Sequence, residues 1–251
     1  MYFCSTVKVD KNGHERPQGF AGLCLVTMFA VKQCVWDASK IFKSMELFAV
    51  DSQQNRLPYD GCAYYYGPII DPRVTTSYYD ILRSEIDWRN DEAIIFGKRI
   101  ITKRKVAWYG DAPYAYTYSK VTKNALPWTP TLDVIKGLAE EKVQVKFNSC
   151  LLNLYHTGTE GMAWHSDGEK ELVKHGVIAS LSLGAERKFA FKHIRTKETV
   201  SIFLQSGSLL TMQDQTQDHW QHRLPPTKKV TTPRINLTFR QMRAQATILN
   251  T

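Results

Sequence analysis

The stretch Arg234-Ile235-Asn236-Leu237-Thr238-Phe239-Arg240 alternates strictly between polar and apolar residues. Successive side chains of a β-strand point to opposite faces, so this pattern predicts a strand with three apolar side chains on one face. Arg234, Asn236, Thr238 and Arg240 then share the other face. Two arginines and an asparagine there indicate a surface that binds something, and the competing interpretation is an ordinary solvent-facing side.

A second group of polar residues lies upstream, in Trp164-His165-Ser166-Asp167. His165 and Asp167 are two residues apart, so on a strand or at its exit both side chains point the same way. A third ligand must come from a distant strand, and His222 is the best candidate. Two imidazoles and one carboxylate that hold three positions of an octahedron are the ligands of non-heme Fe(II) oxygenases. A dianionic co-substrate would explain the arginines.

The remaining histidines are weaker candidates for ligands. His219 lies three residues before His222, so on a strand the two side chains face opposite ways and only one can reach the metal. The others lie in loop-like or strand-end positions, where a histidine is more often solvated or capping; they are His14, His156, His175 and His193. Zinc hydrolase chemistry is the other interpretation of the metal site, and the sequence lacks a general base at the spacing it needs.

Taken together, these residues resemble the AlkB family of Fe(II)/2-oxoglutarate-dependent dealkylases from about residue 57 to residue 242. A lone His-x-Asp triplet would be weak evidence, whereas the ordered set of motifs is specific. The motifs are Asn153-Leu154-Tyr155, His165-Ser166-Asp167, Ile178-Ala179-Ser180-Leu181-Ser182-Leu183-Gly184, His222, and Pro233 followed by the alternating strand.

The resemblance implies Fe(II) as the metal, with 2-oxoglutarate and O2 as co-substrates. It assigns the third metal ligand to His222, which stands before Arg-Leu-Pro. Arg234 would bind the distal carboxylate of 2-oxoglutarate together with Tyr155. Arg240 and Asn153 would hold the carboxylate that also chelates iron, with Asn236 as an orienting hydrogen-bonding residue. Charge-assisted, bidentate donors suit such carboxylates.

The family's activity is oxidative demethylation of bases such as 1-methyladenine and 3-methylcytosine, which is direct reversal DNA repair. Decarboxylation of 2-oxoglutarate to succinate accompanies it, and formaldehyde is released. The chain is therefore expected to be a dioxygenase acting on alkylated single- or double-stranded DNA. The alternatives are an RNA demethylase, a non-catalytic module that binds modified nucleic acid, and an oxygenase of small molecules or proteins.

A basic segment and a tyrosine-rich segment are the expected nucleic-acid contacts. Phe96-Gly97 precedes the basic residues Lys98, Arg99, Lys103, Arg104 and Lys105, which predict a phosphate-binding hairpin or, less informatively, a solvated one. Residues 109–119 resemble the family's nucleotide-recognition lid, which implies that Tyr118 and His165 sandwich a flipped base and that Tyr116 makes a polar contact. Phe96 resembles an intercalating wedge, with core filling as the alternative. Many nucleic-acid members carry a second acid directly after the metal aspartate, where this chain has Gly168 and then Glu169.

The pattern along the chain predicts a mainly β (α+β) fold. Asp71-Pro72 opens one helix, with Tyr78, Ile81, Leu82 and Ile86 as its apolar positions, and Thr129-Pro130 opens a second, which runs out to solvent at residues 140–142. Strands are expected over residues 143–155, 178–183, 188–193, 200–204, 208–212 and 234–239. Many short strands after two helices indicate a double-stranded β-helix, the cupin-like jelly roll, with two supporting helices and an N-terminal nucleotide-recognition lid.

Length, charge and cysteines complete the expectations. The 251 residues suit one main domain, predicted over 45–251, with the lid at about 90–120, the catalytic core at about 143–242, and residues 1–44 as a variable extension that needs no fixed structure. The net charge of +9 favours a polyanionic partner. Five cysteines without a Cys-x-x-Cys pair fit reduced thiols, and Phe20 to Val31 is too short for a membrane span. We expect a monomer without membrane contact, in the cytoplasm or, in a eukaryote, the nucleus.

Overall fold

The computed structural model describes residues 51–95, 98–118 and 121–243. The chain divides after residue 49, and the described residues belong to the second unit, residues 50–251. The predicted extension over residues 1–44 lies outside the described residues, and the domain boundary stays a prediction. Within the described ranges, no helix combines the length and the apolar character that a membrane crossing requires.

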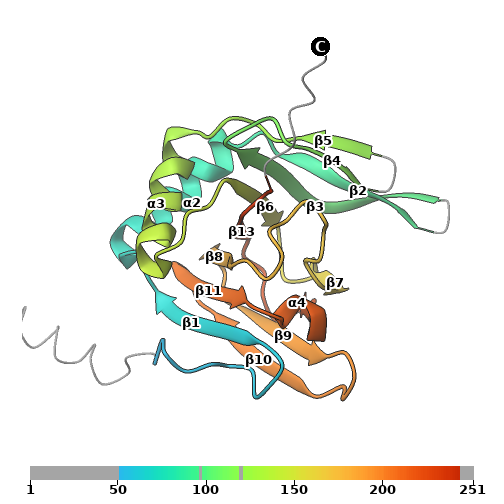
Figure 1. The fold of residues 1–251 in the computed structure, drawn as a ribbon. Helices are drawn as coiled ribbons and strands as arrows, with labels where there is room; N and C mark the ends of the chain where they lie inside the picture. Colours follow the sequence, from blue (N-terminus) through green and yellow to red (C-terminus); the bar gives the residue numbers. More distant parts are fainter. Residues whose placement is uncertain (1–50, 96–97, 119–120, 244–251) are drawn as a thin grey trace, which may run out of the picture. The chain divides into compact units, whose positions relative to one another are not determined.

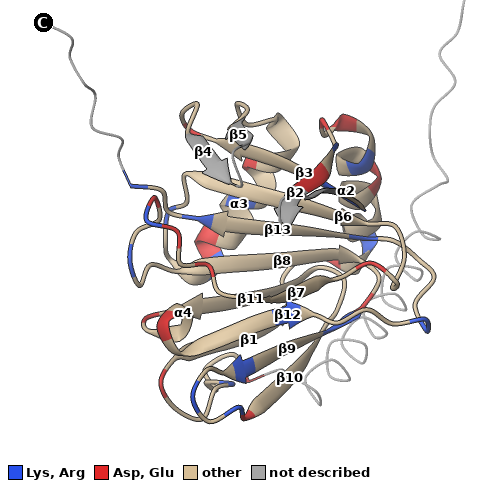
Figure 2. Ribbon diagram, turned by 90° about the vertical axis from the view of Figure 1, so that its right-hand side faces the viewer, with Lys and Arg blue, Asp and Glu red and all other residues tan. Residues whose placement is uncertain are grey.

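Two antiparallel sheets form the body of the second unit (Figure 1). The larger sheet has seven strands in the order β1-β11-β8-β13-β6-β3-β2, and Figure 2 shows β6, β13, β8, β11 and β1 side by side. Its strands are β1 (Cys62–Pro68), β2 (Arg89–Ile95), β3 (Lys98–Gly110), β6 (Ser149–Tyr155), β8 (Ile178–Gly184), β11 (Ser208–Gln213) and β13 (Arg234–Arg240).

The smaller sheet has four strands in the order β10-β9-β12-β7. They are β7 (Met162–His165), β9 (Arg187–His193), β10 (Thr199–Leu204) and β12 (Trp220–Leu224), and a separate hairpin pairs β4 (Ala115–Tyr118) with β5 (Val121–Asn124). The five predicted strands from residue 178 onward match within one residue at each end, and the jelly-roll prediction is confirmed. β7 and β12 were not predicted as separate strands.

The two faces of β13 lie in two different hydrophobic cores. Ile235, Leu237 and Phe239 are each 0% exposed and belong to the core that includes residues of helices α2 (Pro72–Glu85) and α3 (Pro130–Val143). Arg234 lies directly opposite Tyr155 of β6, and Tyr155 belongs to the second core, which joins the large sheet to β9 and β12. The polar face of β13 therefore points into the space between the two sheets. It is not an ordinary solvent-facing side, which was the competing interpretation of its alternating pattern.

Helix α2 begins as the sequence predicts and buries most of the predicted positions. Asp71 is the N-cap and accepts a hydrogen bond from the Arg73 backbone N–H, with Pro72 in the first turn. Leu82 and Ile86 are buried as predicted, and Tyr78 is partly buried against the same core. Ile81 is 39% exposed, and Tyr79 is buried instead. The helix has more apolar residues than its buried face holds, so periodicity alone does not separate Ile81 from Tyr79.

Helix α3 corrects the predicted boundary of the following strand. Its N-cap Thr129 accepts from the Leu132 N–H, as predicted, but the helix continues to Val143 and ends where Gln144 adopts a left-handed conformation with φ 55°. The strand predicted to start at residue 143 starts at Ser149. Glu140 was expected in solvent and is 6% exposed, because its carboxylate accepts from the Phe147 N–H and pairs with Lys146. A further short helix, α4 (Thr216–His219), was not predicted.

Candidate metal and co-substrate site

The register of two neighbouring strands places the three predicted metal ligands together. His165 is the last residue of β7, and His222 of β12 lies directly opposite it in the antiparallel pair. Asp167 follows β7 by two residues, so its side chain returns to the same side. The three residues form one of the groups of described side chains whose ligand atoms all lie within 4.8 Å of one another.

The distances within this triad fit a shared ion better than mutual hydrogen bonds. The Nε2 atoms of His165 and His222 lie 3.6 and 3.7 Å from Oδ1 of Asp167. These separations are too long for hydrogen bonds, whereas metal–ligand bonds of about 2.0–2.2 Å place neighbouring ligand atoms roughly 3 Å apart. Small movements of the side chains would therefore bring all three atoms onto one cation. The donor set suits Fe(II).

The two histidines can direct nitrogen lone pairs to this point. Nδ1 of His165 lies 2.8 Å from the Ala163 carbonyl oxygen, which can only accept, so in the neutral ring Nδ1 carries the proton and Nε2 has the lone pair. His222 is 4% exposed, and its burial lowers the pKa of the imidazole to about 3. A neutral imidazole is the form that binds a metal.

Asp167 is held by hydrogen bonds to two other segments. Its backbone N–H donates to Oε1 of Gln217 at 2.9 Å, and its Oδ2 accepts from Nη2 of Arg240 at 2.5 Å. Burial alone would raise the pKa of this carboxyl, but Arg240 and the two histidines outweigh it and hold the pKa below its usual value. Because Arg240 takes Oδ2, the other oxygen is left facing the histidines.

Arg234 is a buried cation without a carboxylate partner among the described residues. Its side chain is 2% exposed, and its Nη2 donates to Oγ of Ser182 at 2.9 Å and to Oδ1 of Asn236 at 2.6 Å. Its Nε has no hydrogen-bond partner. Burial lowers the pKa of the guanidinium to about 10, so it stays protonated at neutral pH. A buried and unpaired charge of this kind is ready to receive an anion.

A chain of side-chain hydrogen bonds fixes the surroundings of Arg234. Oδ1 of Asn236 also accepts from Ser180 at 3.0 Å, and Nδ2 of Asn236 donates to Thr238 at 2.9 Å. Asn153 lies opposite Asn236 in the β6–β13 pair, and the guanidinium carbon of Arg234 lies 5.7 Å from the ring centre of Tyr155. The predicted co-substrate residues thus line one polar surface inside the barrel.

Of the residues predicted to contact nucleic acid, Arg104 lies in a different environment from the one expected, and the others stay predictions. Arg104 is 7% exposed, pairs with Asp91, and lies over the Tyr155 ring at 5.9 Å, so its charge faces inward rather than toward a phosphate. Lys103 of the same segment is exposed. Phe96 and Gly97 lie outside the described residues, as do the side chains of Lys98, Arg99, Tyr116 and Tyr118.

Several side chains at the site were not predicted. Gln217 orients Asp167, and Arg187, which is 1% exposed, donates to the backbone carbonyls of Gly158, Glu160 and Pro225. His193 was expected to be solvated or capping; it is 1% exposed, and its Nδ1 accepts a hydrogen bond from the Thr196 backbone N–H. No local pattern marks Gln217 or Arg187, because their partners come from segments distant in the sequence.

Comparison with known proteins agrees with this geometry. The profile of the 2OG-Fe(II) oxygenase superfamily matches residues 63–240. The mouse protein "DNA oxidative demethylase ALKBH2" is 42% identical over 156 residues, which cover 59% of this chain and 65% of that protein. The human protein "Alpha-ketoglutarate-dependent dioxygenase alkB homolog 3" is 36% identical over 185 residues, or 70% of this chain and 64% of that protein.

The chain therefore spans less than two thirds of the length of either relative. The solved structure of OsALKBH1 superimposes with a TM-score of 0.51 at 14% identity, covering 74% of this chain and 98% of that one, and supports the fold alone. With the profile spanning most of the second unit, the chain belongs to the 2OG-Fe(II) oxygenase superfamily and, within it, to the AlkB-type dioxygenases.

Proposed function

We propose that this protein is an oxidative demethylase of N-methylated bases in DNA. One observation carries the proposal: Arg240, on the polar face of β13, joins the metal triad through Asp167, and Arg234 lies buried and without a carboxylate on the same face. A metal-binding triad without such cations would suit many reactions. The pair of cations next to it suits a reaction that consumes a dianion.

His165, Asp167 and His222 would hold Fe(II), and Arg234 would bind the distal carboxylate of 2-oxoglutarate. The metal, with 2-oxoglutarate and O2, supplies the oxidation of an N-methyl carbon. In the balanced reaction, one oxygen atom enters succinate and the other forms the hydroxymethyl group, with loss of CO2. The hydroxymethyl amine then releases formaldehyde and leaves N–H. The protein's own residues bind and orient the reactants and exclude water.

Glu169 supports a methylated, positively charged base as the substrate. It lines a cavity of about 170 Å³ together with Asp167 and Arg240, and its Oε2 is buried without a hydrogen-bond partner. Gly168, at the position of the second acid in many family members, is exposed and offers no side chain. The carboxylate next in sequence is thus the group that would favour a cationic base such as 1-methyladenine or 3-methylcytosine.

The relatives named as DNA demethylases favour DNA over RNA, and a product assay decides between them. Matched DNA and RNA oligonucleotides with one 1-methyladenine or 3-methylcytosine are incubated with the full chain, Fe(II), ascorbate and 2-oxoglutarate. Mass spectrometry should show a loss of one methyl group from DNA, together with formaldehyde and succinate. Demethylation of RNA in preference to DNA would assign the alternative substrate. Tight binding of both oligonucleotides without a mass change would identify a binding module.

Glu169→Gln tests in the same assay whether Glu169 favours a cationic methylated base, with Glu171→Gln as the matched control. Glu169→Gln should lower kcat/KM for 1-methyladenine DNA by roughly tenfold, because one charge interaction with the cationic base is lost. Equal kinetics of the two variants would remove Glu169 from base recognition.

A further inference from the structure

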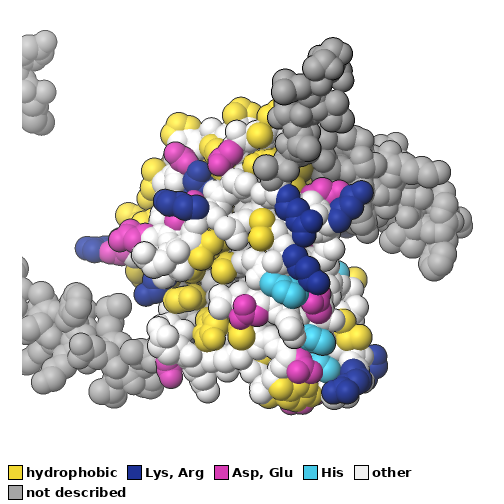
Figure 3. Space-filling model, in the orientation of Figure 1, with side chains coloured by type: hydrophobic (Ala, Val, Ile, Leu, Met, Phe, Trp, Pro, Cys, Tyr) yellow, Lys and Arg dark blue, Asp and Glu magenta, His cyan; other side chains and the backbone are white. Residues whose placement is uncertain are grey.

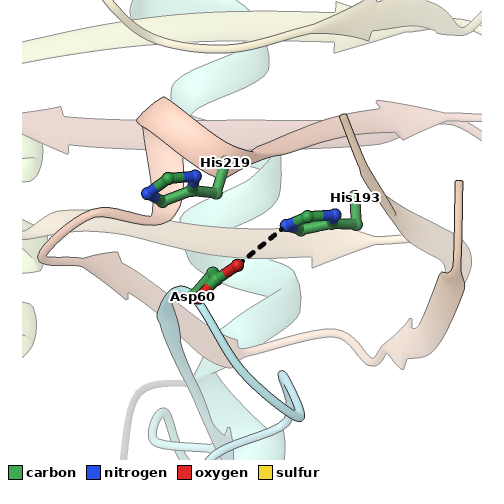
Figure 4. Close-up of side chains that lie close together, drawn as sticks. All are labelled: Asp60, His193 and His219. Carbon is green, nitrogen blue, oxygen red and sulfur yellow. Dashed lines mark ion pairs between the residues drawn. The ribbon is translucent and has the colours of Figure 1, made fainter. Parts of the chain in front are cut away.

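A second group of two histidines and one aspartate has no role in the proposed reaction. Asp60 lies in the loop before β1, His193 is the last residue of β9, and His219 is the last residue of α4. Ligand atoms of all three lie within 4.8 Å of one another, and this group and the triad are the two such groups in the described part of the chain. Figure 4 shows the three side chains around one common space.

The atoms of this group are close but do not form a hydrogen bond. Nε2 of His193 lies 3.2 Å from Oδ2 of Asp60, yet this nitrogen has no partner with hydrogen-bond geometry. His193 is 1% exposed, so its ring is shielded from bulk solvent. The triad has the same property: its atoms approach one another but point toward a shared position. Ligand atoms that surround an ion are arranged in this way.

The surroundings of His193 set the tautomer of its ring. Its Nδ1 accepts a hydrogen bond from the Thr196 backbone N–H at 3.1 Å, so the proton of the neutral ring lies on Nε2. The Thr196 hydroxyl oxygen also lies 3.1 Å from Nδ1. A cation on Nε2 would move this proton to Nδ1, where the hydroxyl can accept it, and the Thr196 N–H would lose its acceptor.

The group is rigid on one side and open on the other. The His193 ring packs against the rings of Tyr59 and Trp220 with centroid distances of 5.1 and 4.9 Å. Trp220 also donates to the Tyr59 carbonyl oxygen, which fixes the backbone beside Asp60. The Asp60 side chain is 41% exposed. Figure 3 shows histidine side chains next to acidic ones on the part of the surface over α4, where a cation can enter from solvent.

We propose that Asp60, His193 and His219 form a second cation site, for a borderline divalent transition-metal ion with Zn²⁺ as the first choice. Imidazole nitrogen and carboxylate oxygen are ligands that such ions prefer, and water would complete the coordination. The ion would connect the loop before β1 to β9 and α4.

Zinc stoichiometry of the full chain tests this site independently of demethylation. We would measure Zn²⁺ by equilibrium dialysis and mass spectrometry of the metal, in the native chain and in Asp167→Ala, which disables the triad. Asp60→Asn should remove one zinc ion per chain in both backgrounds. His219→Ala should do the same, and it provides a second variant if Asp60→Asn folds poorly. Zn²⁺ should also raise the Tm of Asp167→Ala and leave that of Asp167→Ala/Asp60→Asn unchanged.

Asp218→Asn is the matched control. It removes the same charge from a neighbouring exposed aspartate, which pairs with His175 at 2.7 Å and does not belong to the group. The control should keep the zinc ion that Asp60→Asn loses. Equal zinc content of Asp60→Asn, His219→Ala and their parents would overturn the proposal and leave Asp60 and His193 as an ion pair only. Equal loss in Asp218→Asn would overturn it as well, because the effect would then be one of surface charge.

Discussion

The two faces of β13 are both largely buried but serve different purposes. Leu237 is 0% exposed and its neighbours on that face contact helices, whereas Arg234 is 2% exposed on the opposite face and has no carboxylate partner in the described residues. Burial alone therefore does not separate a core from a binding site. The difference lies in whether the buried polar groups are satisfied within the protein, because an unpaired buried charge costs free energy unless a ligand compensates it.

The largest loss of demethylation should come from substitution of the metal ligands, which the polar face of β13 contacts through Arg240. His165→Ala, Asp167→Ala and His222→Ala should each reduce demethylation to the level without enzyme, because each removes one of three protein ligands. His219→Ala should retain most activity, since His219 belongs to the other group. Iron content and product formation are measured on the same samples. Loss of iron in His219→Ala with retention in His222→Ala would reverse the assignment of ligands.

The apolar face should control stability and not chemistry. Leu237→Ala should lower the free energy of unfolding by about 2–5 kcal/mol, because it leaves a cavity in a fully buried position. The Tm should fall by roughly 5–15 °C. Turnover per folded molecule, measured well below the Tm, should be unchanged. Val134→Ala on the solvent side of α3, where Val134 is 53% exposed, is the control and should have almost no effect. A large change in the KM for 2-oxoglutarate with Leu237→Ala would contradict this division.

Arg234 should show the opposite behaviour. Arg234→Lys should raise the KM for 2-oxoglutarate by about 10- to 100-fold, because a point charge replaces a planar group that can donate two hydrogen bonds. The fall of the Arg234 pKa from 12.5 to about 10 corresponds to about 3 kcal/mol of unfavourable burial. Arg234→Met should therefore keep or raise the Tm without 2-oxoglutarate while abolishing the rise in Tm that 2-oxoglutarate gives the native chain. An unchanged KM in Arg234→Lys would assign the distal carboxylate to another residue.

The smallest effect is expected from the hydrogen-bonded chain behind Arg234. Thr238→Val removes the acceptor of the Asn236 Nδ2 group and should raise the KM for 2-oxoglutarate by roughly fivefold, equivalent to about 1 kcal/mol. Thr211→Val is a matched control, because the buried Thr211 hydroxyl has no hydrogen-bond partner. Steady-state kinetics with varied 2-oxoglutarate compare the two. A similar KM for both would show that Asn236 keeps its orientation without Thr238.

Local patterns predicted five of the strands and the starts of α2 and α3, because these features depend on neighbours in the sequence. The period of two along residues 234–240 specifies both faces of β13, and Thr129-Pro130 specifies the start of α3. The same spacing rule predicts that His165 and Asp167 lie on one side of their strand, and it needs no information about His222. The motif as a whole, rather than the spacing, pointed to the third ligand.

The errors concern residues whose environment depends on distant segments. Arg104 was expected on a basic arm, but Asp91 and Tyr155 surround it from a neighbouring strand and from the barrel interior. Glu140 was expected in solvent, but the chain returns and presents the Phe147 N–H to it. His193 was expected to be solvated or capping at a strand end; its Nδ1 does accept from the Thr196 N–H, but Tyr59 and Trp220 cover the ring. Charge and position along an element do not predict such partners.

The contact between Arg240 and Asp167 has a thermodynamic consequence for the assembly of the site. The two side chains form an ion pair at 2.5 Å. A divalent ion on Asp167 would draw charge from this carboxylate and leave Arg240 more strongly attractive to the carboxylate of 2-oxoglutarate. Metal and co-substrate would thus share a coupling free energy, and each would raise the affinity for the other by the same factor. We expect the apparent dissociation constant of either one to depend on the concentration of the other in the cell.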